Sequence, residues 1–316
     1  MRTVERIFRL EGPKGLGARP HPGLVGDLMV QLPDTLRDAV RMGFLHSSRA
    51  EGRLSNALKA ASEVRFVDVS SDSDDVTNVR FELPVFGEAA PELFAQGQLW
   101  DRGPKPEGSA FDLLGDALVD IGAGRVDSDH FDQALLGRIA HYGRLFKHGL
   151  TRIALNGDGG GMIAQVSPAV VESAHMLSRR TPTPRRVRVT GRLDLMGASQ
   201  GILKLHLRPG EIVTALWTGA RNLEEFKDSF NRDVVVEGLG VFRPSGTLLR
   251  IEAEALLPAT SQDEFFRQLP EGIIERDYSQ AVRLRAGEPS VYARILGSIP
   301  AEESDEEFAA AVEAMS

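Results

Sequence analysis

Residues 186–257 decide the fold, because five short apolar runs follow one another there. They read RVRVTGRLDLM (186–196), GILKLHLRPG (201–210), EIVTALWTG (211–219), RDVVVEGLGVF (232–242) and TLLRIEAEALL (247–257). Within 203–208, each leucine is followed by a lysine, histidine or arginine. A period of two is typical of a strand with one face on a core and the other in water. On the last run this pattern places Arg250, Glu252 and Glu254 on the water face.

The segments between these runs contain residues that favour turns, as at Pro209-Gly210 and Pro244-Ser245-Gly246. Between the third and fourth runs, Leu223, Phe226 and Phe230 have helical spacing. Five strands with one helix after the third is the order of an OB-like barrel, which closes its sheet so that few strand edges stay open. The sequence therefore predicts a small OB-like β-barrel over residues 183–260.

The rest of the chain predicts two further parts. Residues 1–178 mix strand patterns, such as VRFVDV (64–69), with amphipathic helical ones, and indicate an α+β domain. The basic, proline-rich segment RRTPTPRR (179–186) is typical of a stiff linker. Residues 261–316 contain twelve acids and five arginines, so they hold −7 of the net charge of −8. The expected fold is an α+β N-terminal domain followed by a small OB-like β-barrel and a C-terminal helical tail.

Composition indicates a compartment. The chain has no cysteine, which excludes disulfides and thiolate metal sites. The opening residues, MRTVERIFRLEG, lack the apolar core of a signal peptide. No run approaches the ~18 consecutive apolar residues that a membrane span requires. We therefore expect a cytoplasmic protein without a membrane partner.

No motif for catalysis or cofactor binding is evident. The seven histidines form no HExxH pattern, the GxSxG elbow is absent, and no glycine-rich phosphate loop opens a helix. The carboxylates show no spacing that singles out an acid–base pair. We expect no catalytic residue, no cofactor and no bound metal. An enzyme whose catalytic part is residues 1–180 stays open as a third reading.

The predicted barrel suggests nucleic acid as one possible ligand, since such barrels bind single strands through basic grooves and aromatic platforms. Its outward row is basic, although stacking residues are few and a barrel used only as a scaffold is an equal alternative. The candidate nucleic-acid-binding residues are Arg186, Arg188, Arg192, Lys204, His206, Arg208 and Trp217.

The end of the chain, VYARILGSIPAEESDEEFAAAVEAM (291–315), predicts a short amphipathic helix. Ser304 and Glu307 have the spacing of an S-x-x-E capping box, and the acids of the first turn suit the positive end of a helix dipole. Phe308, Ala311 and Val312 form an apolar stripe. A helix this short is marginal alone and requires a surface to pack on.

The pattern from Gly297 to Phe308, a glycine, an apolar residue, a proline, a spacer and then ESDEEF, resembles the C-terminal tails of antitoxin-like partners of PIN-domain ribonucleases. That family's tails have tryptophan before the proline and Gly-Asp after it, where this chain has Ile299 and Ala301-Glu302. The resemblance covers about twenty residues and implies a strap across the toxin that keeps its nuclease site closed. The partner-binding residues it implies are Tyr292, Ile295, Leu296, Ile299, Pro300, Glu302, Glu303, Asp305, Glu306, Phe308 and Val312.

Two functions from different classes follow. The first is a non-enzymatic binding protein, an antitoxin or immunity-like partner that neutralises a small PIN-type nuclease encoded nearby. The second is an OB-type protein that binds single-stranded nucleic acid. The domains expected are residues 1–178, 183–260 and an acidic tail, 261–316, with a partner-binding helix.

Overall fold

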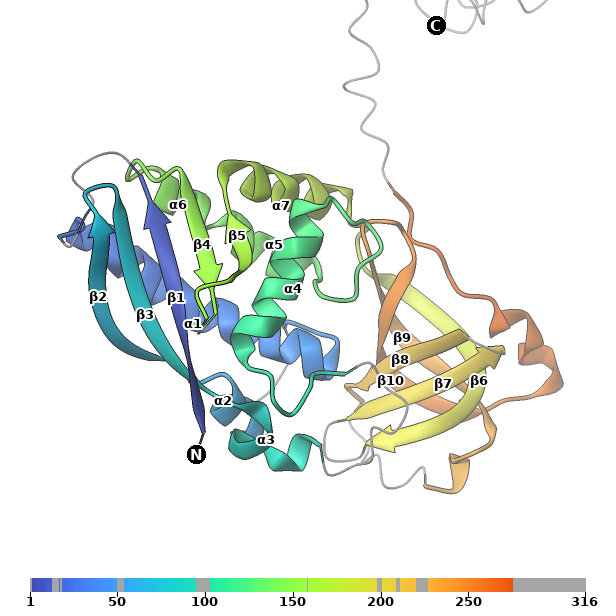
Figure 1. Ribbon diagram of the computed structural model, residues 1–316. Coiled ribbons are helices and arrows are strands. Elements are labelled where there is room, and N and C mark those ends of the chain that lie inside the picture. Colours follow the sequence, from blue (N-terminus) through green and yellow to red (C-terminus); the bar gives the residue numbers. More distant parts are fainter. Residues whose placement is uncertain are drawn as a thin grey trace, which may run out of the picture. The chain divides into compact units, whose positions relative to one another are not determined.

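A helix-covered sheet and a β-barrel follow one another along the chain (Figure 1). The computed structural model describes residues 2–12, 17, 19–49, 54–94, 103–157, 159–197, 201–208, 211–219 and 227–274. Residues Met1–Ile274 belong to one compact unit. The elements of its first part, here called the α/β lobe, are β1 (Thr3–Glu11), α1 (Pro22–Leu45), α2 (Asn56–Ala61), β2 (Arg65–Ser73), β3 (Val76–Pro84), α3 (Phe86–Ala89), η1 (Pro91–Leu93), α4 (Ala110–Gly122), α5 (Gln133–Ala140), α6 (Gly143–Phe146), β4 (Arg152–Asn156), β5 (Met162–Val166) and α7 (Pro168–Arg180). The second part consists of β6 (Arg185–Gly197), β7 (Ile202–Arg208), β8 (Glu211–Trp217), β9 (Asp233–Phe242), β10 (Leu248–Pro258) and the 3₁₀ helix η3 (Ser261–Arg267).

The sheet of the α/β lobe has, in the described ranges, five strands in the order β2-β3-β1-β4-β5, and all neighbours are antiparallel. One face is apolar, with Phe8 and Leu10 of β1 fully buried in a core shared with the helices. The other face bears ion pairs, such as Arg152 with Glu11 and Arg9 with Asp72 at 3.0 Å. One covered and one wet face is the usual condition of an antiparallel sheet.

The helix α1 runs unbroken through Pro33. It begins after His21, whose side chain accepts a hydrogen bond from the amide of Gly23. It ends at His46, which adopts a left-handed conformation with φ of 54°. One side of α1 is buried along its length, so packing on the sheet and on α4 outweighs the loss of one backbone donor.

The predicted barrel is confirmed as a closed five-stranded barrel within the described residues, in the order β6-β7-β8-β10-β9. Consecutive strands β6, β7 and β8 pair antiparallel, β9 pairs antiparallel with both β6 and β10, and β8 pairs parallel with β10. The alternating residues fill the interior as expected, because Val189, Leu203 and Leu205 are fully buried. The helix expected around Leu223 and Phe226 lies outside the described residues.

Close approach of two strands requires a glycine in the barrel wall. The pairing of β9 with β10 shifts between Ala253 and Ala255, as at a β-bulge. A Cβ on Gly238, which faces this shift, would overlap the backbone carbonyl oxygen of Glu252. The carbonyl belongs to the strand ladder and cannot rotate away as a side chain can.

The first residues of the predicted tail pack on the barrel. Helix η3 begins with a capping box between Thr260 and Asp263, and it contacts β6. Further along, the backbone of Gly272 donates to the carbonyl of Gly246 at 2.7 Å. The predicted helix from Ser304 onward lies outside the described residues. In the part of the chain that is described, no helix is both long and apolar enough to cross a membrane.

Replacing Gly238 with alanine should destabilise the protein by about 1–3 kcal/mol, the usual cost of forcing an extra carbon into a packed site. The matched control is Gly26→Ala in α1, where no atom lies within 4 Å of the added carbon. That change should stabilise the protein by roughly 0.5–1 kcal/mol, because alanine has the better helix propensity. Urea unfolding followed by circular dichroism measures both. Equal effects from the two variants would contradict the close approach.

Candidate functional site

The predicted basic row lies on two strands but does not form one continuous site. Arg192 of β6 and His206 of β7 are directly opposite each other in the barrel. Arg186 and Arg188 precede the part of β6 that pairs with β7 and lie instead beside β9, opposite Leu239 and Glu237. The structure thus brings the β6 and β7 members of the row together only at one end.

The two arginines at the start of β6 already have acidic partners. Arg186 contacts the carboxylate of Glu254 at 3.0 Å on the exposed surface. Arg188 contacts Glu237 at 3.2 Å and Asp263 of η3 at 3.0 Å, and its guanidinium lies 4.8 Å from the ring centre of Phe266. These contacts fix η3 on the barrel and satisfy the charge that a nucleic-acid phosphate would otherwise neutralise.

The end of the row where β6 and β7 pair is also engaged. Arg192 donates to the side-chain oxygen of Asn231 at 2.8 Å, and a ring nitrogen of His206 lies 3.1 Å from Asp194. Burial lowers the pKa of Lys204. Trp217 packs on the edge of the barrel core, which is a structural position for a residue expected to stack on bases. The side chain of Arg208 lies outside the described part of the chain.

Sequence reasoning placed Glu254 on the water face but missed Glu237 and Asp263, the two acids that pair with Arg188. Glu237 occupies an outward position of RDVVVEGLGVF, so strand alternation could have placed it on the surface beside Arg188. Asp263 comes from the segment assigned to the tail, and no local pattern links it to β6. All the predicted partner-binding residues, from Tyr292 to Val312, lie outside the described residues.

A buried ion pair joins the barrel to the α/β lobe, and it corrects one expectation. Arg250 was expected in water, but only 4% of its surface is exposed. Its guanidinium donates to Asp132 at 3.2 Å and to the carbonyl of His46 at 3.0 Å. Asp132 also accepts from the amide and hydroxyl of Ser48 and from the amide of Leu135. The outer face of β10 is covered here because the lobe packs on it.

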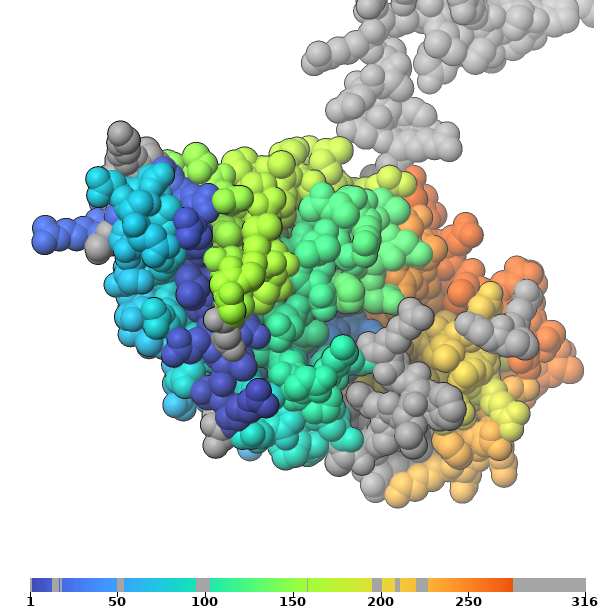
Figure 2. All heavy atoms as spheres, in the orientation of Figure 1, coloured from blue at the N-terminus to red at the C-terminus, as the bar shows by residue number. Residues whose placement is uncertain are grey.

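Apolar contacts between the barrel and the α/β lobe surround this ion pair. The junction is here called the seam, and on the barrel side it consists of Arg250, Ile202, Leu216, Val241 and Leu249. Those four apolar residues belong to the core of the α/β lobe rather than to the barrel interior. In the space-filling view, the green part of the chain borders the orange part (Figure 2), in agreement with the hydrogen bond from the amide of Ser245 to the carbonyl of Val126 at 2.9 Å.

The loop between α4 and α5 clamps the turn between β9 and β10. Asp127 accepts from the hydroxyls of Ser245 and Thr247, at 3.0 and 2.6 Å, and these bonds hold its pKa below the usual range. Arg243 forms an ion pair with Asp129. Burial at the same junction lowers the pKa of His46, because a protonated imidazole there would lose hydration.

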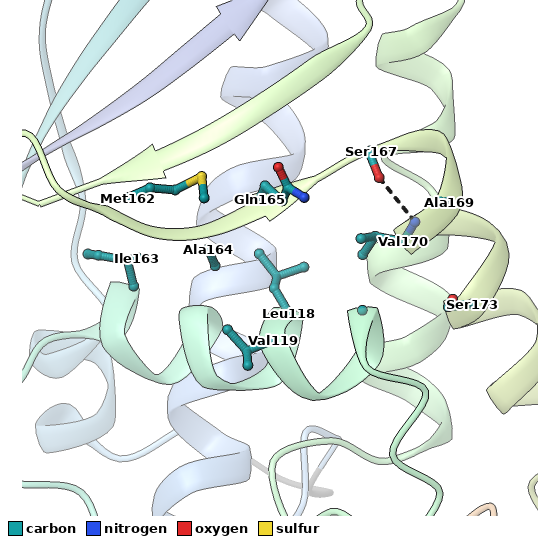
Figure 3. Close-up of a pocket in the computed structure, with 11 residues that line it drawn as sticks. Leu118, Val119, Met162, Ile163, Ala164, Gln165, Ser167, Ala169, Val170 and Ser173 are labelled. Carbon is teal, nitrogen blue, oxygen red and sulfur yellow. Dashed lines mark hydrogen bonds between the residues drawn. The ribbon is translucent and has the colours of Figure 1, made fainter.

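An apolar hollow lies beside the edge strand β5 (Figure 3). Its volume is about 360 Å³, and its walls come from α4, β5 and the start of α7. Leu118 and Val119 of α4 lie beneath Met162 and Gln165 of β5 in the close-up. The lining contains no titratable side chain, so this hollow offers shape and apolar surface but no acid or base.

A second hollow is lined mainly by charged rather than apolar side chains. It lies among α1, α2 and α5, has a volume of about 550 Å³, and is lined mainly by cations. A smaller hollow of about 320 Å³ adjoins it and shares two of its arginines. The lining residues of the larger one are Arg37, Asp38, Arg41, Arg49, Leu54, Lys59, Ser62 and Arg138.

Among the described residues, no group of three or more histidine or acidic side chains has the arrangement of a metal site. Comparison with protein-family models, with curated protein sequences and with solved structures found no match to this chain.

Replacing Asp132 with alanine should destabilise the protein by about 3–5 kcal/mol, because it removes the buried carboxylate that pairs with Arg250 and leaves that guanidinium only the part-exposed carboxylate of Glu252. The change also removes the side chain that caps α5. Glu254→Gln is the matched control, since its partner Arg186 is exposed and such surface pairs contribute about 0–1 kcal/mol. Chemical denaturation measures both free energies of unfolding. A small effect for Asp132→Ala would mean that the seam does not hold the two parts together.

Proposed function

We propose that this chain is a non-enzymatic binding protein that holds a small PIN-type nuclease through its C-terminal segment. The observation that carries the proposal is the sequence of residues 292–312, where an apolar stretch leads into an acidic capping box and a short amphipathic helix pattern. In the sequence, this segment follows the compact unit Met1–Ile274. A helix pattern that short requires a surface to pack on, and a partner protein supplies one.

Charge favours a nuclease as the partner. An enzyme that binds the phosphate backbone of RNA presents positive charge around its active site. Residues 302–307 of this chain contain five acids in six positions, which are complementary to such a surface. The basic residues of the barrel are, in contrast, largely paired with the chain's own acids, so the barrel is less suited to bind a polyanion.

The test is to co-express the chain with the product of its neighbouring gene and to measure the affinity of the complex. Phe308→Ala should weaken it by about 2–4 kcal/mol, since a buried phenyl group contributes at least the free energy of its transfer from water. The double variant Glu302→Gln/Glu303→Gln should mainly slow association and flatten its salt dependence, because charges at a rim steer encounter.

Equilibrium titration and stopped-flow mixing separate the two effects. If no complex forms with or without residues 288–316, the proposal fails. If Phe308→Ala leaves the affinity unchanged but lowers the thermal stability of the isolated chain, the segment packs on its own fold instead.

A second candidate is favoured by the barrel itself. Its strand order, with the third strand parallel to the fifth and the fourth strand closing against the first, is the connectivity of an OB-fold. Many barrels of this kind bind single-stranded nucleic acid. For this candidate, the row on β6 and β7 would exchange its carboxylate partners for phosphates.

Binding of single-stranded oligonucleotides by the full chain, measured across a salt series, tests this second candidate. The full chain is required because the seam residues of the barrel belong to the core of the α/β lobe. Affinity should fall steeply with salt, and Arg186→Gln/Arg192→Gln should reduce the salt slope by about 2, one for each lost phosphate contact. An unchanged slope, or no binding at low salt, would rule out the basic row as the site.

A further inference from the structure

The cation-lined hollow among α1, α2 and α5 is the strongest concentration of like charge in the described cavities. Helix α1 contributes Arg37 and Arg41, which are four residues apart and therefore on one face of the helix. Lys59 comes from α2 and Arg138 from α5, and Arg49 lies between α1 and α2. Three helices and the segment after α1 thus bring five cations to one concave surface.

Cations outnumber acids in the described lining of this hollow. Asp34 and Asp38 both bind Arg138, at 3.3 and 3.0 Å. Asp34 also pairs with Arg37. The described lining contains five cations and one carboxylate, that of Asp38, in a chain whose net charge is −8. An anion that enters the hollow would reduce the mutual repulsion of these cations.

Two of the cations are available for a ligand. The side chains of Arg49 and Lys59 are exposed and have no hydrogen-bond or ion-pair partner in the described part of the chain. Arg138, by contrast, is held in place by Asp34 and Asp38. A fixed arginine beside two unengaged cations is a suitable arrangement for a group with several anionic oxygens.

The local environment strengthens attraction to an anion. Burial lowers the pKa of Arg41 and raises that of Asp38, which shows that both lie in a region of reduced hydration. Asp38 lines the hollow but is only 4% exposed, and its carboxylate is engaged by Arg138 at 3.0 Å. Charge-assisted hydrogen bonds are stronger in such a region than in open water.

The adjoining hollow indicates that the ligand is larger than a bare phosphate. It shares Arg49 and Arg138 with the first and adds Gln133, Ala134, Gly137 and His141. The small side chains of Ala134 and Gly137 next to an anion site leave room for the uncharged portion of the same molecule. The combined size of the two hollows is in the range of small-molecule sites.

We propose that these two hollows form a binding site for a small organic phosphate of the nucleotide class. Its phosphate groups lie among Arg41, Arg49 and Lys59, with Arg138 at the boundary, and its organic part lies against α5 beside Gly137. The site is on the α/β lobe and is independent of both the C-terminal segment and the basic row of the barrel.

Isothermal titration of the full chain with inorganic phosphate, pyrophosphate and ATP tests the site. Saturable binding is expected, with affinity increasing from phosphate to ATP as more oxygens and the organic part are engaged. Arg49→Gln/Lys59→Gln should weaken ATP binding at least tenfold, because each change removes a charge-assisted contact. Since neither side chain has a partner in the described fold, the thermal midpoint should stay close to that of the parent protein.

The matched control is Arg19→Gln/Arg232→Gln, which removes the same total charge from exposed positions outside both hollows. It should change ATP affinity by less than twofold. Equal weakening by both double variants would show attraction to overall charge and would overturn the site. The absence of saturable heat with all three probes at millimolar concentration would also overturn it.

A single-stranded oligonucleotide is the last probe. If it binds more tightly than ATP and loses affinity in Arg49→Gln/Lys59→Gln, the hollow recognises a nucleic-acid backbone, and the assignment to a small phosphate is wrong. If the double variant unfolds, the ATP affinity of the single variant Arg49→Glu is compared with that of the parent protein instead. Arg49 lies between α1 and α2, so this change replaces no helical residue.

Discussion

The buried pair of Arg250 and Asp132 is the interaction on which the arrangement of this protein depends. Both side chains are almost fully removed from water, and a charge in that position is costly unless it has a partner. Asp132 also accepts from Ser48 and caps α5, while Arg250 also binds the carbonyl at the end of α1. One contact therefore fixes the ends of two helices and a barrel strand together.

The apolar surroundings of this pair explain why the lobe and the barrel form one compact unit. Leu249 and Val241 belong to the core of the α/β lobe and not to the barrel interior. A barrel alone would expose these side chains to water. The polar clamp of Asp127 and Asp129 on the β9–β10 turn then fixes the direction in which the two parts meet. The ion pairs determine the orientation of the two parts, and the buried apolar area supplies the free energy that holds them together.

Charge has different consequences in different parts of the same chain. On the barrel, arginines alternate along a strand and find acids on the next strand or on η3, so the surface is close to neutral. In the hollow among α1, α2 and α5, the arginines outnumber the acids and face a common space. A count of basic residues in the sequence does not distinguish these two cases. What distinguishes them is the position of the carboxylates.

The sequence by itself determined the local structure. A period of two predicted the strands of the barrel, and turn residues placed their ends, because backbone geometry links these patterns directly to conformation. Local pattern also predicted a strand at residues 64–69, where β2 lies. It could not decide which polar residues of a strand meet water. Arg250 has the spacing of an exposed residue, and it is buried only because α1 and α5 pack over β10.

The tertiary structure alone decided the candidate sites. Arg37 and Arg138 are about a hundred positions apart, and they share a hollow because α1 and α5 pack against each other. No spacing rule in the sequence links them. The predicted basic row is the opposite case. Strand alternation placed its arginines on the outer surface, but the acids that pair with them come from β9, β10 and η3. A strand pattern is set by neighbours in the chain, whereas a binding site is set by neighbours in space.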